Sequence, residues 1–223
     1  MPGSVTWLPA VDAEPDDRPD GAGEDHPMRV VTRQVAAGPE GWTDERRDKV
    51  GGLFDGLAKE WHTRDGPGRH LPLSDALDRG AVDTGRALEL GSGTGLVTSD
   101  LVDRFECVVA ADLAMEMLRR APDVAPRVRV DATHLPLPSG SVDALVLMNM
   151  LLFPAEADRV LAPDGALVWV NSRGAATPIH LPAEDVVAAL PGAWSAVASS
   201  HGSATWCVAR RAVDGSPPGG NAR

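Results

Sequence analysis

A glycine-rich turn between a short apolar segment and a helical one constrains the fold of this chain most. Residues 87–95 read Ala-Leu-Glu-Leu-Gly-Ser-Gly-Thr-Gly, and a helical pattern follows over 96–105. Glycine has no Cβ, so the backbone of such a turn can approach a bound ligand closely. A strand, a glycine turn and a helix in this order predict an α/β fold with a ligand at the turn.

The alternation of apolar runs and helical patterns continues after this turn. Strands are expected at 87–90, 107–111, 128–130, 142–148 and 166–170, with helices at 96–105, 114–120 and 155–161. Continuous apolar strands separated by helices are typical of a parallel sheet that is buried on both faces. After a helix at 183–190, two strands at 194–199 and 204–210 are joined by a short polar connection, which predicts an antiparallel hairpin.

The segments before and after this region differ in composition. Between residues 9 and 27 the chain is mostly Pro, Asp, Glu, Gly and Ala, so residues 1–40 are predicted to be a disordered acidic tail, or a segment that folds over the site when ligand binds. Residues 41–84 are predicted to form a helical cover, with an amphipathic helix from an N-cap at Thr43 to about Trp61 and a short helix at 73–78. Residues 85–212 would be the core domain and 213–223 a flexible tail.

Composition excludes several classes of function. The 223 residues carry a formal net charge of −11, and their Lys and Arg residues are scattered singly, which disfavours nucleic acids and anionic membranes as partners. No apolar run approaches the roughly 20 residues needed to span a bilayer, and the first residues lack an export signal. Cys107 and Cys207 suit buried free thiols. We expect a cytoplasmic protein that is a monomer or a homodimer.

Three acids near the ends of predicted strands select among nucleotide-containing ligands. A dinucleotide-binding turn would need a small residue where this chain has Leu96. Glu89 would repel a pyrophosphate but can accept hydrogen bonds from an ammonium group. Asp112, which lies 21 residues after Gly91, can accept from both hydroxyls of a ribose, and Asp131 from the amino group of adenine. S-adenosylmethionine carries all three groups and no phosphate.

On these motifs the chain resembles the class I S-adenosylmethionine-dependent methyltransferases from about residue 87 to residue 211. The matching segments are the turn at 89–95, Asp112-Leu113-Ala114 with Met117-Leu118, Asp131-Ala132, and the loops at 135–143 and 159–167. The resemblance implies a Rossmann-like three-layer α/β sandwich whose seven strands are ordered 3-2-1-4-5-7-6, with the last strand antiparallel. It also implies S-adenosylmethionine as cofactor, S-adenosylhomocysteine as product, and cofactor contacts at Glu89, Gly91, Ser92, Gly93, Gly95, Asp112, Leu113, Met117, Asp131, Ala132 and Asn149.

Acceptor-binding residues are harder to predict, because methyl transfer needs mainly alignment, exclusion of water and, for some acceptors, a base. The loop after the strand at 166–170 should face the acceptor, since open α/β sheets bind ligands outside the carboxyl ends of their strands. We predict His180 in this loop as the general base, because an unperturbed imidazole titrates near pH 6.5. Acceptor contacts are predicted for Trp61, Arg64, Met150 and Asn171. No metal site is predicted, although a divalent cation that chelates a catechol acceptor stays an alternative.

The predicted function is methyl transfer to O, N or C of a small-molecule substrate, in secondary metabolism or cofactor maturation. The chain has no basic groove or large recognition domain, which favours a small acceptor. Two alternatives remain open. The fold could bind S-adenosylmethionine without methyl transfer, as a partner subunit or a cyclisation catalyst, or it could methylate a basic peptide or protein that matches the acidic surface.

Overall fold

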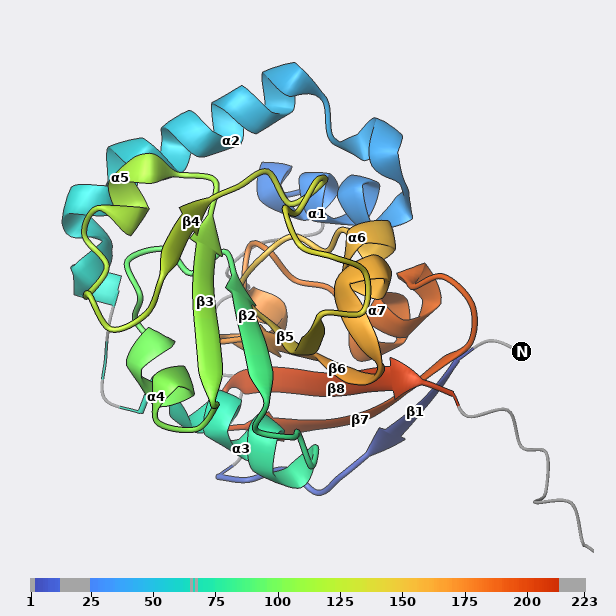
Figure 1. Ribbon diagram of the computed structural model, residues 1–223. Coiled ribbons are helices and arrows are strands. Elements are labelled where there is room, and N and C mark those ends of the chain that lie inside the picture. Colours follow the sequence, from blue (N-terminus) through green and yellow to red (C-terminus); the bar gives the residue numbers. More distant parts are fainter. Residues whose placement is uncertain (1–2, 13–24, 65, 67, 213–223) are drawn as a thin grey trace, which may run out of the picture.

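One eight-stranded sheet with helices on both faces forms the centre of the protein (Figure 1). The computed structural model describes residues 3–12, 25–64, 66 and 68–212. Across the sheet the strands are β1 (Ser4–Trp7), β7 (Trp194–His201), β8 (Ala204–Arg211), β6 (Leu161–Asn171), β5 (Val142–Met148), β2 (Arg86–Leu90), β3 (Cys107–Asp112) and β4 (Arg127–Arg129). Only β8 runs antiparallel to its neighbours among these strands.

The seven expected strands are confirmed in the expected order, from β4 at one edge to the antiparallel hairpin of β7 and β8 at the other. The helices between them are α4 (Thr98–Val102), α5 (Met115–Leu118), α6 (Pro154–Val160) and α7 (Ala183–Ala189). The first of these helices begins later than the helical pattern at 96–105 indicates, because the glycine turn continues through Leu96. The fold class is therefore the predicted Rossmann-like α/β sandwich, with one strand more.

The prediction that residues 1–40 are disordered is wrong for two segments. β1 adds an eighth strand, which pairs in parallel with β7 from Ser4 opposite Ser195 to Trp7 opposite Ala198. Helix α1 (Pro27–Ala37) buries Thr32 and Val35. Composition averaged over the segment hid the apolar residues that flank its acidic middle. The middle itself, residues 13–24, lies outside the described residues, as does the predicted tail at 213–223.

Alternate residues of the central strands feed two separate hydrophobic cores. Leu145 and Leu147 of β5 face the core beneath α1, α6 and α7, while Ala144 and Val146 face the core formed with α3 (Leu71–Arg79) and α4. This alternation follows from the period of two residues in a strand. Cys207 is buried as expected, whereas Cys107 is exposed because it begins β3 at the end of the sheet.

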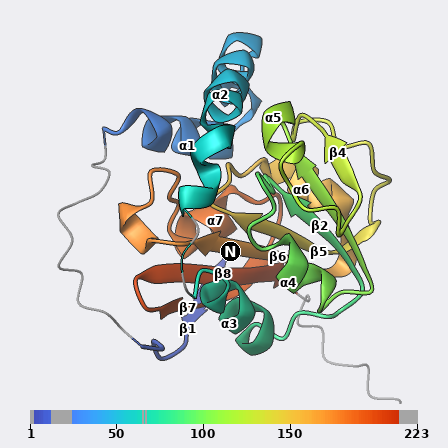
Figure 2. The same cartoon turned by 90° about the vertical axis from the view of Figure 1, so that its left-hand side faces the viewer.

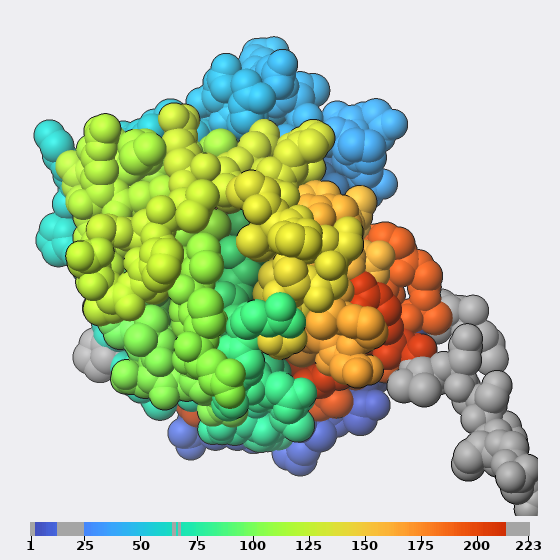
Figure 3. All heavy atoms as spheres, viewed as in Figure 1, coloured from blue at the N-terminus to red at the C-terminus, as the bar shows by residue number. Residues whose placement is uncertain are grey.

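A helical cover stands over the carboxyl ends of the strands and projects from the surface of the sheet domain (Figures 2 and 3). It consists of α1, the 3-10 turn η1 (Pro39–Gly41), α2 (Asp44–Leu57) and the 3-10 helix η2 (Ala58–Arg64). Thr43 caps α2 as predicted, but the single helix expected to reach Trp61 changes to 3-10 geometry after Leu57. None of the α2 residues is fully buried, so α2 depends on contacts made at its two ends.

The cover is attached to the sheet domain by hydrogen bonds as well as by apolar contacts. Arg29 of α1 is 4% exposed and donates from Nη2 to the carbonyl oxygens of Ala175 and Thr177, the latter at 2.8 Å, in the loop after β6. The carboxylate of Asp55 in α2 accepts a 2.7 Å hydrogen bond from the backbone N–H of Glu116 at the start of α5. Hydrogen bonds therefore fix both ends of the cover.

Replacing Arg29 with methionine should destabilise the protein, because two carbonyl groups lose a charged donor in a buried position. Hydrogen bonds to charged groups contribute about 1.5 to 3 kcal/mol each, so we expect Arg29→Met to lower the free energy of unfolding by about 3 to 6 kcal/mol. Urea denaturation followed by circular dichroism measures this loss. The exposed Arg33 of the same helix supplies the control, and Arg33→Met should cost less than about 1 kcal/mol. Equal losses in the two variants would contradict the prediction.

Candidate cofactor and acceptor site

A cavity of about 960 Å³ lies between the cover and the carboxyl ends of the strands. The glycine turn, the ends of β3, β5 and β6, the turn between β7 and β8, and the inner side of the cover all contribute to its wall. Ligand pockets usually measure about 300 to 1,000 Å³, so this cavity has room for a cofactor and an acceptor side by side.

The glycine turn requires glycine for two reasons. Gly91 and Gly95 have φ angles of +77° and +75°, in the left-handed region that other residues rarely adopt. A Cβ on Gly91 would also lie 2.6 Å from the Met150 sulfur, and one on Gly95 would lie 2.8 Å from Pro122 Cδ. Gly91 lines the cavity, whereas Gly95 packs behind the turn and does not. Gly95 therefore shapes the turn but, contrary to the sequence prediction, is not placed to contact a ligand in the cavity.

Glu89 is a buried carboxylate that faces the cavity. Its side chain accepts a 2.6 Å hydrogen bond from the Thr98 hydroxyl, and the residue is only 4% exposed. Burial raises the pKa of Glu89 to about 7, and the negative charge of Asp112 adds to the effect. Glu89 forms no ion pair with another described residue. A cation placed in the cavity would therefore stabilise the ionised form of Glu89 and offset the cost of burying its charge.

Asp112 and Ser92 add polar groups next to Glu89. The Asp112 carboxylate accepts hydrogen bonds from the backbone N–H groups of Gly93 at 2.8 Å and Ala114 at 2.7 Å, which orients the turn. Burial nevertheless raises the pKa of Asp112. The buried Ser92 hydroxyl has no hydrogen-bond partner within the described structure, and such groups usually have one. The predicted residues Gly93, Leu113, Met117 and Ala132 complete this part of the wall.

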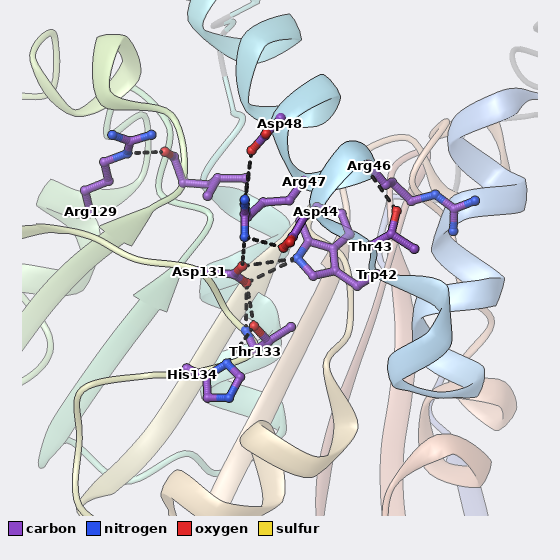
Figure 4. Close-up of polar contacts among 11 residues, drawn as sticks. Trp42, Thr43, Asp44, Arg46, Arg47, Asp48, Arg129, Asp131, Thr133 and His134 are labelled. Atoms are coloured by element: carbon purple, nitrogen blue, oxygen red, sulfur yellow. Dashed lines mark hydrogen bonds and ion pairs between the residues drawn. The ribbon is translucent and has the colours of Figure 1, made fainter.

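Asp131 does not line the cavity, although Val130 and Ala132 on either side of it do. Its carboxylate accepts hydrogen bonds from the Trp42 indole N–H at 3.2 Å and from the backbone and hydroxyl of Thr133 at 3.0 and 2.9 Å (Figure 4). Arg47 of α2 approaches it to 4.0 Å. The structure thus uses the predicted adenine acceptor to hold the start of α2.

Trp42 takes the place in the cavity wall that the sequence assigned to Asp131. Its ring lines the cavity and packs edge-on against Phe153, with 5.3 Å between the ring centroids. A tryptophan held at one edge by a carboxylate and on one side by a phenyl ring has little rotational freedom. We infer a fixed aromatic wall at this end of the cavity.

Asn149 ties together the ends of β5 and β6. Its side chain accepts from the Ser172 backbone N–H and donates to the Ser172 hydroxyl, both at 2.9 Å, and both residues line the cavity. The predicted residues Trp61 and Met150 line it as well. Trp61 lies over the glycine turn, because a Cβ on Gly93 would be 3.5 Å from its indole nitrogen.

Two predicted acceptor residues are not brought to the cavity. His180 lines a separate depression of about 100 Å³ with Trp7 and Trp206, and burial lowers its pKa to about 4. Asn171 is fully buried and holds the loop after β6, accepting from Trp169 Nε1 at 3.0 Å and donating to the Ile179 carbonyl at 2.8 Å. Thr177, Pro178 and Ile179 line the cavity, whereas the chain turns away after Ile179 and His180 lines the separate depression.

Other residues of the cavity wall were missed by sequence reasoning. They are Trp42, Arg173, His26 and the turn residues His201 and Ser203. The sequence could have indicated Arg173, because it lies two residues beyond the end of β6, in the loop that was expected to face the acceptor. The turn lies at this edge because β8 runs antiparallel, which only its pairing reveals. The Arg64 side chain lies outside the described structure.

Two features are absent from the described residues. None of the helices there has the length and apolar character needed to cross a membrane. The same part of the chain contains no group of three or more His, Cys, Asp or Glu residues arranged to hold a metal ion.

The Asp131 contacts predict a measurable effect on the cover. Asp131→Ala removes the acceptor of the Trp42 N–H and the charge near Arg47, which should cost about 1 to 3 kcal/mol of local stability. Amide hydrogen exchange in α2 should therefore accelerate by roughly 5- to 100-fold, while exchange in β2 and β5 stays unchanged. Asp123→Ala, which breaks an exposed ion pair with Arg127, is the control and should leave α2 unaffected. Unchanged exchange in α2 of the Asp131 variant would refute the anchoring role.

The raised pKa of Glu89 predicts how the stability of the unliganded protein varies with pH. Between its usual value of 4.5 and about 7, folded Glu89 holds a proton that the unfolded chain releases, so its contribution to stability falls as pH rises through this window. Glu89→Gln should raise the thermal midpoint at pH 8 and change it little at pH 5. The exposed Glu106 is the control, and Glu106→Gln should shift the midpoint at neither pH. A Glu89→Gln midpoint below that of wild type at pH 8 would contradict the assignment.

Comparison with known proteins finds methyltransferases that are similar to the part of the chain containing the glycine turn. Residues 88–169 match a protein-family model described as a methyltransferase domain. Demethylmenaquinone methyltransferase of Beutenbergia cavernae is 35% identical over 152 residues, which cover 58% of this chain and 60% of that protein. Malonyl-[acyl-carrier protein] O-methyltransferase of Geobacter sulfurreducens is 36% identical over 103 residues, which cover 40% and 39% of the two chains. This chain therefore matches less than two thirds of the length of either relative.

Solved structures of low sequence identity share the fold. The complex of DhpI with SAH has a TM-score of 0.58 at 21% identity and covers 82% of this chain and 97% of its own. A DhpI-SAM-HEP complex has a TM-score of 0.52 at 19% identity, with 71% and 94% coverage. The family match at residues 88–169, the glycine turn and this strand order agree with a Rossmann-like methyltransferase domain of the class I S-adenosylmethionine-dependent type.

Proposed function

We propose that the protein transfers a methyl group from S-adenosylmethionine to a small-molecule acceptor. The observation that carries this proposal is Glu89, a buried carboxylate that faces a large cavity beside Asp112 and has no cationic partner among the described residues. An amino-acid ammonium group would supply the missing cation, and that group distinguishes S-adenosylmethionine from the dinucleotides.

The residues of the cavity wall fit the cofactor group by group. Glu89 would hold the ammonium group, Asp112 would accept from the ribose hydroxyls, and the unpartnered Ser92 hydroxyl would gain a polar neighbour. The adenine would contact an apolar wall of Leu113, Met117, Ala132 and the ring of Trp42. In this assignment Asp131 acts through Trp42 rather than on the ligand.

When bound, S-adenosylmethionine supplies an electrophilic methyl group on a positively charged sulfur. The chain itself contributes alignment and exclusion of water. Trp61, Phe54 and Leu57 of the cover close the cavity above the glycine turn, and the Asn149 to Ser172 hydrogen bonds fix the wall on the acceptor side. His180 faces a different depression, so we no longer assign it as the general base.

A small acceptor suits the position of the cavity beneath the cover. Two methyltransferases whose names specify an acceptor, demethylmenaquinone and malonyl-[acyl-carrier protein], are among the relatives, and they support methyl transfer as the activity. Their two acceptors differ, so they do not select one for this chain. The production of S-adenosylhomocysteine during turnover would separate methyl transfer from binding alone.

Calorimetric titration tests the cofactor assignment. We expect S-adenosylhomocysteine and S-adenosylmethionine to bind and NAD not to bind. Glu89→Gln should weaken binding by roughly 10- to 100-fold, since one or two hydrogen bonds between charged groups are lost. Wild-type affinity should also fall as pH drops from 8 to 6, because Glu89 must release its proton to meet the ammonium group.

The matched control for this titration is Glu106→Gln. It makes the same change at an exposed residue outside the cavity and should leave the affinity unchanged. The weakened binding that remains in Glu89→Gln should no longer depend on pH between 6 and 8. Binding of NAD in preference to S-adenosylhomocysteine, or equal affinities of the Glu89 variant and wild type, would exclude the assignment.

A further inference from the structure

The far part of the cavity wall contains an arginine, although the protein as a whole is acidic. The chain carries a net charge of −11. The wall formed by the cover, the loop after β6 and the turn between β7 and β8 nevertheless includes Arg173, together with His26 and His201. Asp12 is the one carboxylate there among the described residues, since Glu89 and Asp112 lie at the glycine turn.

The order of the strands separates Arg173 and the turn between β7 and β8 from the glycine turn. Moving from β2 across β5 to β6 places Arg173 two strands away, and the turn between β7 and β8 lies one to two strands farther. With neighbouring strands about 4.8 Å apart, the distances along the sheet from the glycine turn are roughly 10 Å to Arg173 and roughly 14 to 19 Å to the turn between β7 and β8. Arg173 is therefore close enough to the glycine turn to contact an acceptor that lies beside a bound cofactor.

The backbone that carries Arg173 is fixed on several sides. Ser172, the preceding residue, is hydrogen-bonded to Asn149, and the backbone N–H of Arg173 donates to the Thr177 hydroxyl at 3.1 Å. Buried Arg29 binds the carbonyl groups of Ala175 and Thr177 in the same loop. A rigid backbone reduces the entropy that a side chain loses when it binds a ligand.

The Arg173 side chain itself is exposed and lines the cavity, and no ion pair of the described residues includes it. In contrast, Arg79, Arg86 and Arg159 each pair with a carboxylate of their own chain. A guanidinium group offers two parallel N–H donors that match a carboxylate or phosphate group. The side chain of Arg173 is thus available to an anion in the cavity.

Apolar side chains form the remainder of the acceptor part of the wall. They are Leu53, Phe54, Leu57, Leu71, Met148 and Ile179. We propose that the acceptor is an amphipathic anion, whose apolar body packs on these residues while its carboxylate, phosphate or phosphonate group binds Arg173. The inference rests on the proposed function, which places the cofactor at the other end of the cavity.

Four eight-carbon compounds with the same chain test the inference, each titrated into protein saturated with S-adenosylhomocysteine. We expect octanoate and octylphosphonate to bind at least tenfold more tightly than octanol, and octylamine to bind most weakly, because Arg173 attracts anions and repels an ammonium group. Comparison of the two anions distinguishes a carboxylate from a phosphonate acceptor. Arg173→Ala should lose at least tenfold of the octanoate affinity, and Arg173→Lys should retain part of it.

Lys49→Ala is the matched control, since it removes one exposed positive charge outside the cavity and should leave octanoate binding unchanged. Affinity for S-adenosylhomocysteine should agree within twofold between Arg173→Ala and wild type. If wild type binds no S-adenosylhomocysteine, the proposed function fails. If it does bind, the anionic acceptor is refuted by octanol or octylamine binding as tightly as octanoate, or by unchanged octanoate affinity in Arg173→Ala.

Discussion

The cavity depends on polar contacts that hold a helical cover over the carboxyl ends of the strands. Helix α2 buries none of its residues completely, so burial alone does not fix its position. The Asp131 carboxylate holds Trp42 at one end of α2, Asp55 caps α5 near the other, and Arg29 attaches α1 to the loop after β6. Because hydrogen bonds depend steeply on distance and angle, these three contacts set the height of the cover above the sheet.

Burial of charge links the stability of the site to its ligand. Glu89 and Asp112 both lie at the glycine turn, where burial raises the pKa of each and the charge of Asp112 further disfavours ionised Glu89. Such a pair weakens the unliganded protein at neutral pH, and a bound cation would reverse that effect. The same carboxylate that limits stability would thereby supply selectivity for a ligand with an ammonium group.

The cofactor half and the acceptor half of the cavity are formed by different kinds of residues. At the glycine turn the backbone conformation and two carboxylates define the wall. On the other side, the loop after β6 and the turn between β7 and β8 bring arginine and histidine side chains next to an apolar surface. This second half depends on the antiparallel course of β8, which returns the chain to the carboxyl edge of the sheet.

The sequence by itself determined the sheet order and the cofactor half of the site, because both depend on local patterns: apolar strands, the glycines at 91, 93 and 95, and the acids that follow strand ends. Glu89 and Asp112 needed only their strand positions to reach the cavity. The tertiary structure alone decided the rest. Asp131 faces Trp42, His180 faces away and Arg173 faces the cavity, because the packing of the cover and the folding of the loop after β6 orient these side chains through contacts between residues distant in sequence.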